Sequence, residues 1–177
     1  MKDEMVEVMN QDGQPTGIYK MRSHVHRSGE WHNSVHVWVI YEDKVLLQKR
    51  NADRESFPDM YDVSAAGHVS AGETPELAAV RETEEEIALR IDEKDLISVG
   101  VLRLCYSDKQ KAYISNEFNY IFAYKSDHQI ENIHYDTREM QSIDWVHIED
   151  LKRDIEAHPS DYCISLEELN LLLKEVF

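Results

Sequence analysis

Alternation of hydrophobic and polar positions with a period of two recurs along this chain, and it predicts a protein built mainly on β-strands. The first two alternating segments flank a turn signal at residues 10–13, so we expect an N-terminal hairpin over residues 5–21. Further strands are expected at residues 35–41, 44–49, 62–66, 97–104, 112–124 and 142–146.

Three other segments follow the helical period. Residues 75–89 consist mostly of strong helix formers, and Thr74 followed by Pro75 is a favourable helix start. Apolar residues at helical spacing predict a second helix over residues 148–158. A capping-box sequence opens the last helix, residues 165–177.

A polar, histidine-rich segment, residues 23–33, leads into the strand at residues 35–41, and the polar segment at residues 51–60 is expected to be a loop. Strands interleaved with helices predict an α/β or α+β fold with a mixed sheet, in a single domain over residues 1–177. No apolar run approaches the roughly 18 residues of a membrane span, and the charged start has no signal-peptide core. We therefore expect a cytoplasmic protein that does not enter membranes, with Cys105 and Cys163 as reduced thiols.

Acidic residues outnumber basic ones by 35 to 19, so the formal net charge is −16. Such a charge repels a nucleic-acid backbone, and nucleic-acid binding is not expected. A small phosphorylated ligand remains compatible with this charge if metal ions screen it locally. The useful question is whether carboxylates gather where chemistry requires them.

The first helix does gather carboxylates. At roughly 100° per residue, Arg81, Glu82, Glu85 and Glu86 fall within one arc of the helix. The opposite side is expected to be buried and carries Val80, Thr83 and Ile87. Like charges at this spacing repel, so the arc is either a plain solvated acidic face or a site for a divalent cation. Oxygen ligands suit Mg²⁺ or Mn²⁺ better than zinc.

A glycine-bearing loop before this helix makes the pattern specific. Loop and helix together, residues 67–89, resemble the Nudix box. Its fixed positions are met by Gly67, Glu73, Arg81, Glu82, Glu85 and Glu86. Thr83 stands where an aliphatic residue is usual, and Ala88 stands where a second glycine is usual. Both departures leave the resemblance intact.

This resemblance implies a Nudix α/β/α sandwich with a mixed sheet. It also implies a Mg²⁺-dependent pyrophosphohydrolase, with Mn²⁺ as an alternative cofactor, that uses a metal-activated water to cleave a nucleoside diphosphate derivative or a related small diphosphate. The implied metal site consists of Glu82, Glu85, Glu86 and Gly67, and Arg81 orients a glutamate. The proton acceptor is either a box glutamate or Glu117.

Residues 31–38 and 64–68 further resemble the isopentenyl-diphosphate isomerase branch of the superfamily. That resemblance implies that His32 and His68 are metal ligands and that Glu117 is catalytic. Ala66 replaces the cysteine of those isomerases and cannot transfer a proton, so we favour a hydrolase over the isomerase alternative. A catalytically silent nucleotide-sensing module is the other alternative, against which the intact box carboxylates argue.

Two sets of residues and one segment have two interpretations each. Five histidines fit either a second metal site or neutral rings packed at a strand edge: His24, His26, His32, His36 and His68. Four aromatic residues could stack on a base, although core packing is the simpler expectation: Phe57, Tyr61, Tyr106 and Tyr113. The N-terminal hairpin fits either a homodimer interface or the wall of a pocket.

Overall fold

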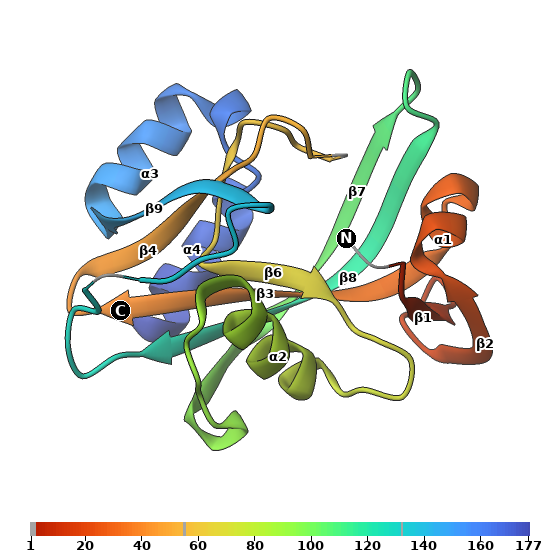
Figure 1. Cartoon of the computed structure of the whole chain (residues 1–177), viewed down its shortest axis with the longest axis horizontal. Coiled ribbons are helices and arrows are strands. Elements are labelled where there is room, and N and C mark those ends of the chain that lie inside the picture. Colours follow the sequence, from red (N-terminus) through yellow and green to blue (C-terminus); the bar gives the residue numbers. More distant parts are fainter. Residues whose placement is uncertain (1–2, 55, 132) are drawn as a thin grey trace.

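The computed structural model describes residues 3–54, 56–131 and 133–177, and within them one mixed sheet of nine strands forms the centre of the molecule (Figure 1). The strands are β1 (Met5–Met9), β2 (Pro15–Met21), β3 (Trp31–Tyr41), β4 (Lys44–Arg50), β5 (Tyr61–Asp62), β6 (Ala65–His68), β7 (Leu96–Asp108), β8 (Tyr113–Lys125) and β9 (Met140–His147). The helices are α1 (Arg22–Ser28), α2 (Pro75–Ile87), α3 (Ile148–Ala157) and α4 (Leu166–Val176), with short 3-10 turns η1 (Glu93–Asp95) and η2 (Pro159–Asp161).

Strand β3 is the axis of the sheet, and the sheet divides along one of its edges. One edge of β3 pairs in parallel with β8 over nearly its full length, and β8 pairs with β7 in a hairpin that extends beyond the rest of the sheet (Figure 1). On the other edge, β4 pairs with β3 at only two positions beside their turn. Farther along the same edge, β6 pairs with β3 from Ser34 to Val37. Strand β4 there pairs with β5 and β9 instead. A gap therefore separates β4 from β6.

Helices cover both faces of the sheet, because β3 directs apolar side chains to alternate sides. Val35 and Val37 pack with the alanines of α2. Trp38 and Ile40 pack with α3 and α4 on the opposite face. Figure 1 shows α2 and α4 on opposite sides of β3. Full burial of each such large apolar side chain is worth about 1.5–3 kcal/mol. The arrangement confirms the predicted α/β/α sandwich with a mixed sheet.

Helix α1 lies mostly in the polar, histidine-rich segment, where the sequence predicted neither a helix nor a strand. The helix contributes one apolar side chain to a small cluster, Val25, which packs with Val6 and Val8 of β1. Gly29 ends it in the left-handed conformation, with φ of 73°, and donates its N–H to the Val25 carbonyl at 2.8 Å. One apolar anchor and a glycine cap produce no periodic pattern, which is why the sequence did not reveal this helix.

The other predicted helices and strands are present with ends that differ by a few residues, apart from the strand expected at residues 62–66. That segment is divided into β5, which pairs with β4, and β6, which pairs with β3. The box helix was expected to reach residue 89 but ends at Ile87, because Ala88 adopts the left-handed conformation with φ of 53°. Ala88 thus serves as the C-cap where a glycine is usual in the Nudix box. Over the part of the chain that the structure describes, no helix combines the length and the apolar character needed to span a membrane.

Candidate active site

A cavity of about 1190 Å³ opens at the gap where the sheet divides. It is large enough for a small organic ligand. Helix α2 and strands of the sheet contribute to its lining, including Glu82 and Glu86 of α2, His36 of β3, Arg50 of β4, Tyr106 of β7 and Glu117 of β8.

Glu82 and Glu86 form what we call the carboxylate wall of this cavity, and both side chains are buried. Glu86 accepts hydrogen bonds on one oxygen from the Ala66 N–H at 3.1 Å and from the Gln48 amide at 3.2 Å. Glu82 accepts one from Arg81 at 2.7 Å. Backbone and side-chain donors therefore fix both carboxyl groups in place.

Both groups have pKa values well above the ordinary range of a glutamate. Burial raises the pKa of Glu82 to about 7, although the neighbouring Arg81 opposes the shift. Burial, followed by the charge of Glu82, raises the pKa of Glu86 to about 8. The protein alone thus stabilises the two negative charges poorly. A cation beside them would lower both pKa values and favour the ionised carboxylates.

Gly67 of β6 lies directly against the carboxylate of Glu82. A Cβ atom at Gly67 would stand 2.1 Å from both the carboxyl carbon and Oε1 of Glu82. No side chain fits there unless Glu82 moves. The glycine is therefore required by close packing.

Arg81 ties the loop before α2 to the carboxylate wall. Its guanidinium donates to both oxygens of Glu73, at 3.0 and 2.8 Å, and to the backbone oxygen of His68 at 3.0 Å. The same side chain reaches Glu82 at 2.7 Å and lies 3.6 Å from Glu85. These contacts hold the carboxylates of Glu73 and Glu82 against the Arg81 guanidinium.

The sequence placed three box glutamates on one open arc, and the structure separates them. Glu82 and Glu86 face β6 and β4 and are buried, whereas the Glu85 side chain is 63% exposed at the rim of the cavity. On the side that was expected to be buried, Thr83 and Ile87 are buried and Val80 is half-buried. The helix thus buries two faces, because Glu82 packs against Gly67 and Glu86 bonds to Gln48 and Ala66.

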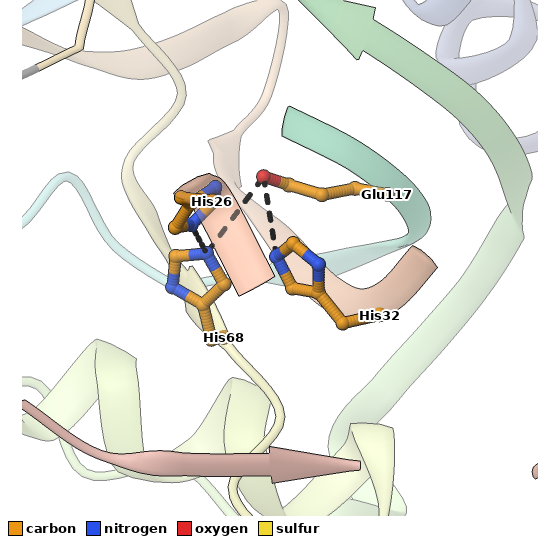
Figure 2. A group of neighbouring side chains, drawn as sticks. All are labelled: His26, His32, His68 and Glu117. Carbon is orange, nitrogen blue, oxygen red and sulfur yellow. Dashed lines mark hydrogen bonds and ion pairs between the residues drawn. The ribbon is translucent and has the colours of Figure 1, made fainter. Parts of the chain in front are cut away.

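Four residues from separate elements form a second cluster, the imidazole group, which consists of His26, His32, His68 and Glu117. Figure 2 shows the three rings and the carboxylate directed toward a common point. One ligand atom from each lies within 4.8 Å of all the others. The Nε2 atoms of His26 and His68 are 3.1 Å apart, and Glu117 Oε1 lies 3.7 Å from Nε2 of both His32 and His68.

Hydrogen bonding sets the tautomers of two of these rings. His32 Nδ1 lies 3.0 Å from the Glu30 carbonyl and His26 Nδ1 lies 3.3 Å from the Ile114 carbonyl. A carbonyl only accepts, so each Nδ1 carries the proton and each Nε2 presents a lone pair in the neutral ring. Nε2 of His32 is buried and has no hydrogen-bond partner in the described part of the chain.

The imidazole group combines neutral rings with an ionised carboxylate, which are the protonation states that a metal ion requires of its ligands. Burial, chiefly, lowers the pKa of His26 to about 3 and that of His32 to about 4, so both rings are neutral near pH 7. Burial would raise the pKa of Glu117, but hydrogen bonding to His68 and the charges of His68 and His32 outweigh it and hold that pKa well below its ordinary value. Neutral imidazoles beside a carboxylate are a donor set typical of transition metals.

Of the five histidines named from the sequence, the structure brings three together. His24 is exposed, and His36 instead contacts Glu168 of α4 at 2.9 Å. Sequence spacing alone could not assign the group, because α1 carries His26 and was not predicted.

Three of the four aromatic residues named from the sequence line the cavity. Phe57 packs on Tyr106 with ring centroids 4.2 Å apart, and Tyr113 lies 6.2 Å from Tyr106. The N-terminal hairpin contributes Met5 and Met21 to the same lining, which supports the pocket-wall interpretation.

The fourth aromatic residue, Tyr61, packs on Tyr162 with ring centroids 5.4 Å apart. Tyr61 is 38% exposed, so the core packing expected for it is not found. The aromatic residues thus divide between cavity and packing roles.

A model of the NUDIX domain matches residues 30–166, which include β3, the box loop, α2 and the whole of β8. The chain belongs to the Nudix family. Isopentenyl-diphosphate Delta-isomerase of Roseobacter denitrificans is 28% identical over 85% of this chain and 82% of that protein. Family and isomerase-like branch are therefore as the sequence predicted.

Two further relatives and one solved structure agree with this assignment. Nudix hydrolase 3 of Arabidopsis thaliana is 40% identical over 69% of this chain, but the chain spans only 16% of that protein. Prenyl-diphosphate phosphatase of Methanosarcina mazei is 31% identical over 82% of this chain and 77% of that protein. A crystal structure from Deinococcus radiodurans shares the Nudix-like fold, with a TM-score of 0.72 at 20% identity over 98% of this chain and 100% of that chain.

Proposed function

We propose that this protein is a Mg²⁺-dependent hydrolase that cleaves the diphosphate linkage of a small molecule bound in the cavity. The observation that carries the proposal is the burial of Glu82 and Glu86 side by side on the cavity wall. Buried like charges are unfavourable unless a cation accompanies them. The match to the NUDIX domain supports the same chemistry.

The donor set of the carboxylate wall fits a hard divalent cation, because it consists of oxygen atoms. Glu82 and Glu86 would hold the ion, and Glu85 would reach it from the rim. A cation there supplies charge that neutralises phosphate oxygens and lowers the pKa of a water molecule. Gly67 keeps the space beside Glu82 open, and Arg81 holds Glu82 in position.

We assign the role of proton acceptor to Glu85. Its carboxylate is exposed at the rim of the cavity, where it can take a proton from the attacking water and release it to solvent. Glu117 was the alternative acceptor, but Ser115 donates to its carboxylate and His68 lies 3.7 Å from it. Glu117 is better suited to the role of a ligand.

The imidazole group supports a second cation site. Three ring nitrogens and a carboxylate oxygen converge, and the partnerless Nε2 of His32 is a buried polar atom that a metal would satisfy. Nitrogen donors favour a transition metal such as Mn²⁺ or Zn²⁺ over Mg²⁺. The two sites would then differ in the ion they prefer.

The organic part of the substrate is proposed to be apolar or aromatic. Phe57, Tyr106 and Tyr113 line the cavity together with two methionines, and such a lining favours a prenyl chain or a stacked base. The likeness to the prenyl-diphosphate phosphatase makes a prenyl diphosphate the second candidate beside a nucleoside diphosphate derivative. Isomerisation is not proposed, because Ala66 has no group that transfers a proton.

A substrate screen with matched variants tests this proposal. Purified protein is incubated with Mg²⁺ and a panel of nucleotide sugars, dinucleotides, nucleoside triphosphates, prenyl diphosphates and isopentenyl diphosphate, and released phosphate or pyrophosphate is measured. Glu86→Gln removes one ligand of the carboxylate wall. Glu84→Gln is the control, because Glu84 lies on the same helix but pairs with Arg90 in solvent.

We expect at least one diphosphate to be cleaved by the wild type and by Glu84→Gln, and not by Glu86→Gln. Binding of panel members without cleavage by any protein would instead favour a silent sensing module. Conversion of isopentenyl diphosphate to its isomer would overturn the hydrolase assignment.

A further inference from the structure

A buried three-residue network joins the cavity to the C-terminal helix. His36 Nδ1 of β3 lies 2.9 and 3.1 Å from the two carboxylate oxygens of Glu168 in α4. Trp38 donates its indole N–H to the same carboxylate at 3.0 Å. Glu168 is 1% exposed, so this carboxylate is held entirely by protein donors.

Glu168 does not serve in the way that its position in the sequence suggests. The capping-box pattern predicts that its side chain turns back to the backbone of Ser165. Ser165 does accept the N–H of Glu168 at 3.1 Å, which caps α4. The Glu168 carboxylate, however, extends to β3 and binds His36. A residue that could have completed a cap is used to hold a histidine ring.

The His36 ring has a second nitrogen that Glu168 leaves unused. His36 lines the cavity opposite Ala66, its cross-strand partner in β6. Nδ1 contacts Glu168, and Nε2 makes no hydrogen bond within the described residues. Burial alone would lower the pKa of His36, but the charge of Glu168 and the hydrogen bond to it raise that pKa to about 9. The ring is thus a charged donor at neutral pH.

Position along β3 separates His36 from the imidazole group. His32 and His36 lie four residues apart on the same face of an extended strand, which corresponds to about 13 Å. The other buried cation nearby, Arg50, is committed to Asp62 at 2.8 Å. Among these groups, His36 is the one placed to offer an N–H to a ligand between the two ends of the cavity.

We propose that His36 is a phosphate-binding residue, whose Nε2–H donates to a phosphate oxygen of the ligand while Glu168 holds the ring in place. This inference rests on the proposed function in so far as the ligand is a diphosphate. Charge-assisted donors of this kind are shorter and stronger than neutral ones. Glu168 acts through His36 and is a positioning residue.

Direct binding of inorganic pyrophosphate tests the inference apart from catalysis. Calorimetric titration with Mg²⁺ present compares the wild type with His36→Asn, whose amide can keep the Nδ1 contact with Glu168 but lacks the Nε2 donor. We expect affinity to fall by about tenfold to a hundredfold, as for loss of a hydrogen bond between charged groups. Glu168→Gln should weaken binding by about tenfold. The control Glu167→Gln, at an exposed neighbouring position of α4, should leave it unchanged.

A spectroscopic measurement on the wild type tests the inference even if the variants do not fold. Long-range ¹H–¹⁵N spectra should show the His36 ring protonated on both nitrogens, and added pyrophosphate should shift Nε2 more than Nδ1. In Glu168→Gln the ring signals should move toward those of a neutral imidazole, which loss of packing alone would not produce.

The outcomes separate this inference from the proposed function. Unchanged pyrophosphate affinity in folded His36→Asn, with hydrolysis intact in the wild type, would overturn the role of His36 and leave the hydrolase standing. Pyrophosphate binding that depends on His36, with no hydrolysis of any diphosphate, would keep the inference and overturn the hydrolase. An Nε2 resonance that ignores pyrophosphate while the wild type binds it would also overturn the inference.

Discussion

The carboxylate wall and two members of the imidazole group, His68 and Glu117, line one cavity, but the two groups are assembled in different ways. Glu82 and Glu86 lie one turn apart on a single helix, and the adjoining Gly67 loop completes their surroundings. The imidazole group draws on α1, β3, β6 and β8, so its members are brought together only by the folded sheet. A site whose residues lie close together in the sequence can be recognised as a motif, whereas a site assembled by tertiary contacts cannot.

The two groups also respond to pH in opposite directions. The folded pKa of Glu86 lies above its ordinary value, so its contribution to the free energy of unfolding is present at low pH and is lost as pH rises to about 8. The folded pKa of His26 lies below its ordinary value, so its contribution is present at high pH and is lost as pH falls from 6.5 toward about 3. Without metal, each group limits stability at its own end of the pH range.

The largest expected effect comes from Gly67→Ala, which would disrupt the carboxylate wall alone. The new Cβ would collide with Glu82 at 2.1 Å, so kcat should fall by about a hundredfold or more and the free energy of unfolding by about 1–3 kcal/mol. Steady-state kinetics and denaturant titration measure the two effects. Gly72→Ala is the control, because its left-handed φ costs stability while its Cβ meets nothing within 4 Å. Equal losses of kcat in both variants would contradict the steric explanation.

A second prediction concerns the imidazole group. His32→Ala removes the buried Nε2, and we expect affinity for Mn²⁺ or Zn²⁺ to fall by about tenfold to a hundredfold, with about one bound ion fewer at saturation. Equilibrium dialysis with metal analysis gives both quantities. His24→Ala, at an exposed position, should bind metal like the wild type. Unchanged stoichiometry in His32→Ala would mean that the cavity holds its ions at the carboxylate wall alone.

A third prediction uses the opposite pH responses. In metal-free protein, the free energy of unfolding should decline between about pH 6.5, above which His26 no longer offsets the effect of Glu86, and about pH 8. The slope should be at most about 1.4 kcal/mol per pH unit for each group, because the unfolded chain has already released the proton that folded Glu86 keeps. Glu86→Gln should flatten this decline, while the decline toward acid pH, to which His26 contributes, should remain. Urea titrations across the pH range measure both limbs. An equally steep alkaline limb in Glu86→Gln would refute the assignment.

The smallest expected effect concerns the aromatic lining. Phe57→Leu should raise KM by about threefold to tenfold with little change in kcat, because stacking with the substrate would be lost and the metal sites would remain. Tyr61→Leu, which removes a ring that packs on Tyr162, is the comparison variant and should leave KM near the wild-type value. The two KM values are compared on whichever diphosphate the screen identifies. A larger effect from Tyr61→Leu would show that the cavity lining was misassigned.

Much of this molecule could be predicted from its sequence. Alternating patterns located the strands, and the Gly67-to-Glu86 spacing identified the box because those residues act within one loop and helix. Burial of Glu82 and Glu86 could not be predicted, since it depends on the separation of β4 from β6. The partnership of His36 with Glu168, 132 residues apart, follows from the packing of α4 on the sheet. Local sequence carries no signal for such a contact.

The division of the sheet has a mechanical consequence that centres on Glu86. This carboxylate accepts from Gln48 of β4 and from Ala66 of β6, and it thereby bridges the two strands that part from each other. Both donors reach the same oxygen, so the other oxygen is left for an ion. Under the proposed function, Glu86 would hold the ion and tie β4 to β6 at the same time, and its loss would remove both links.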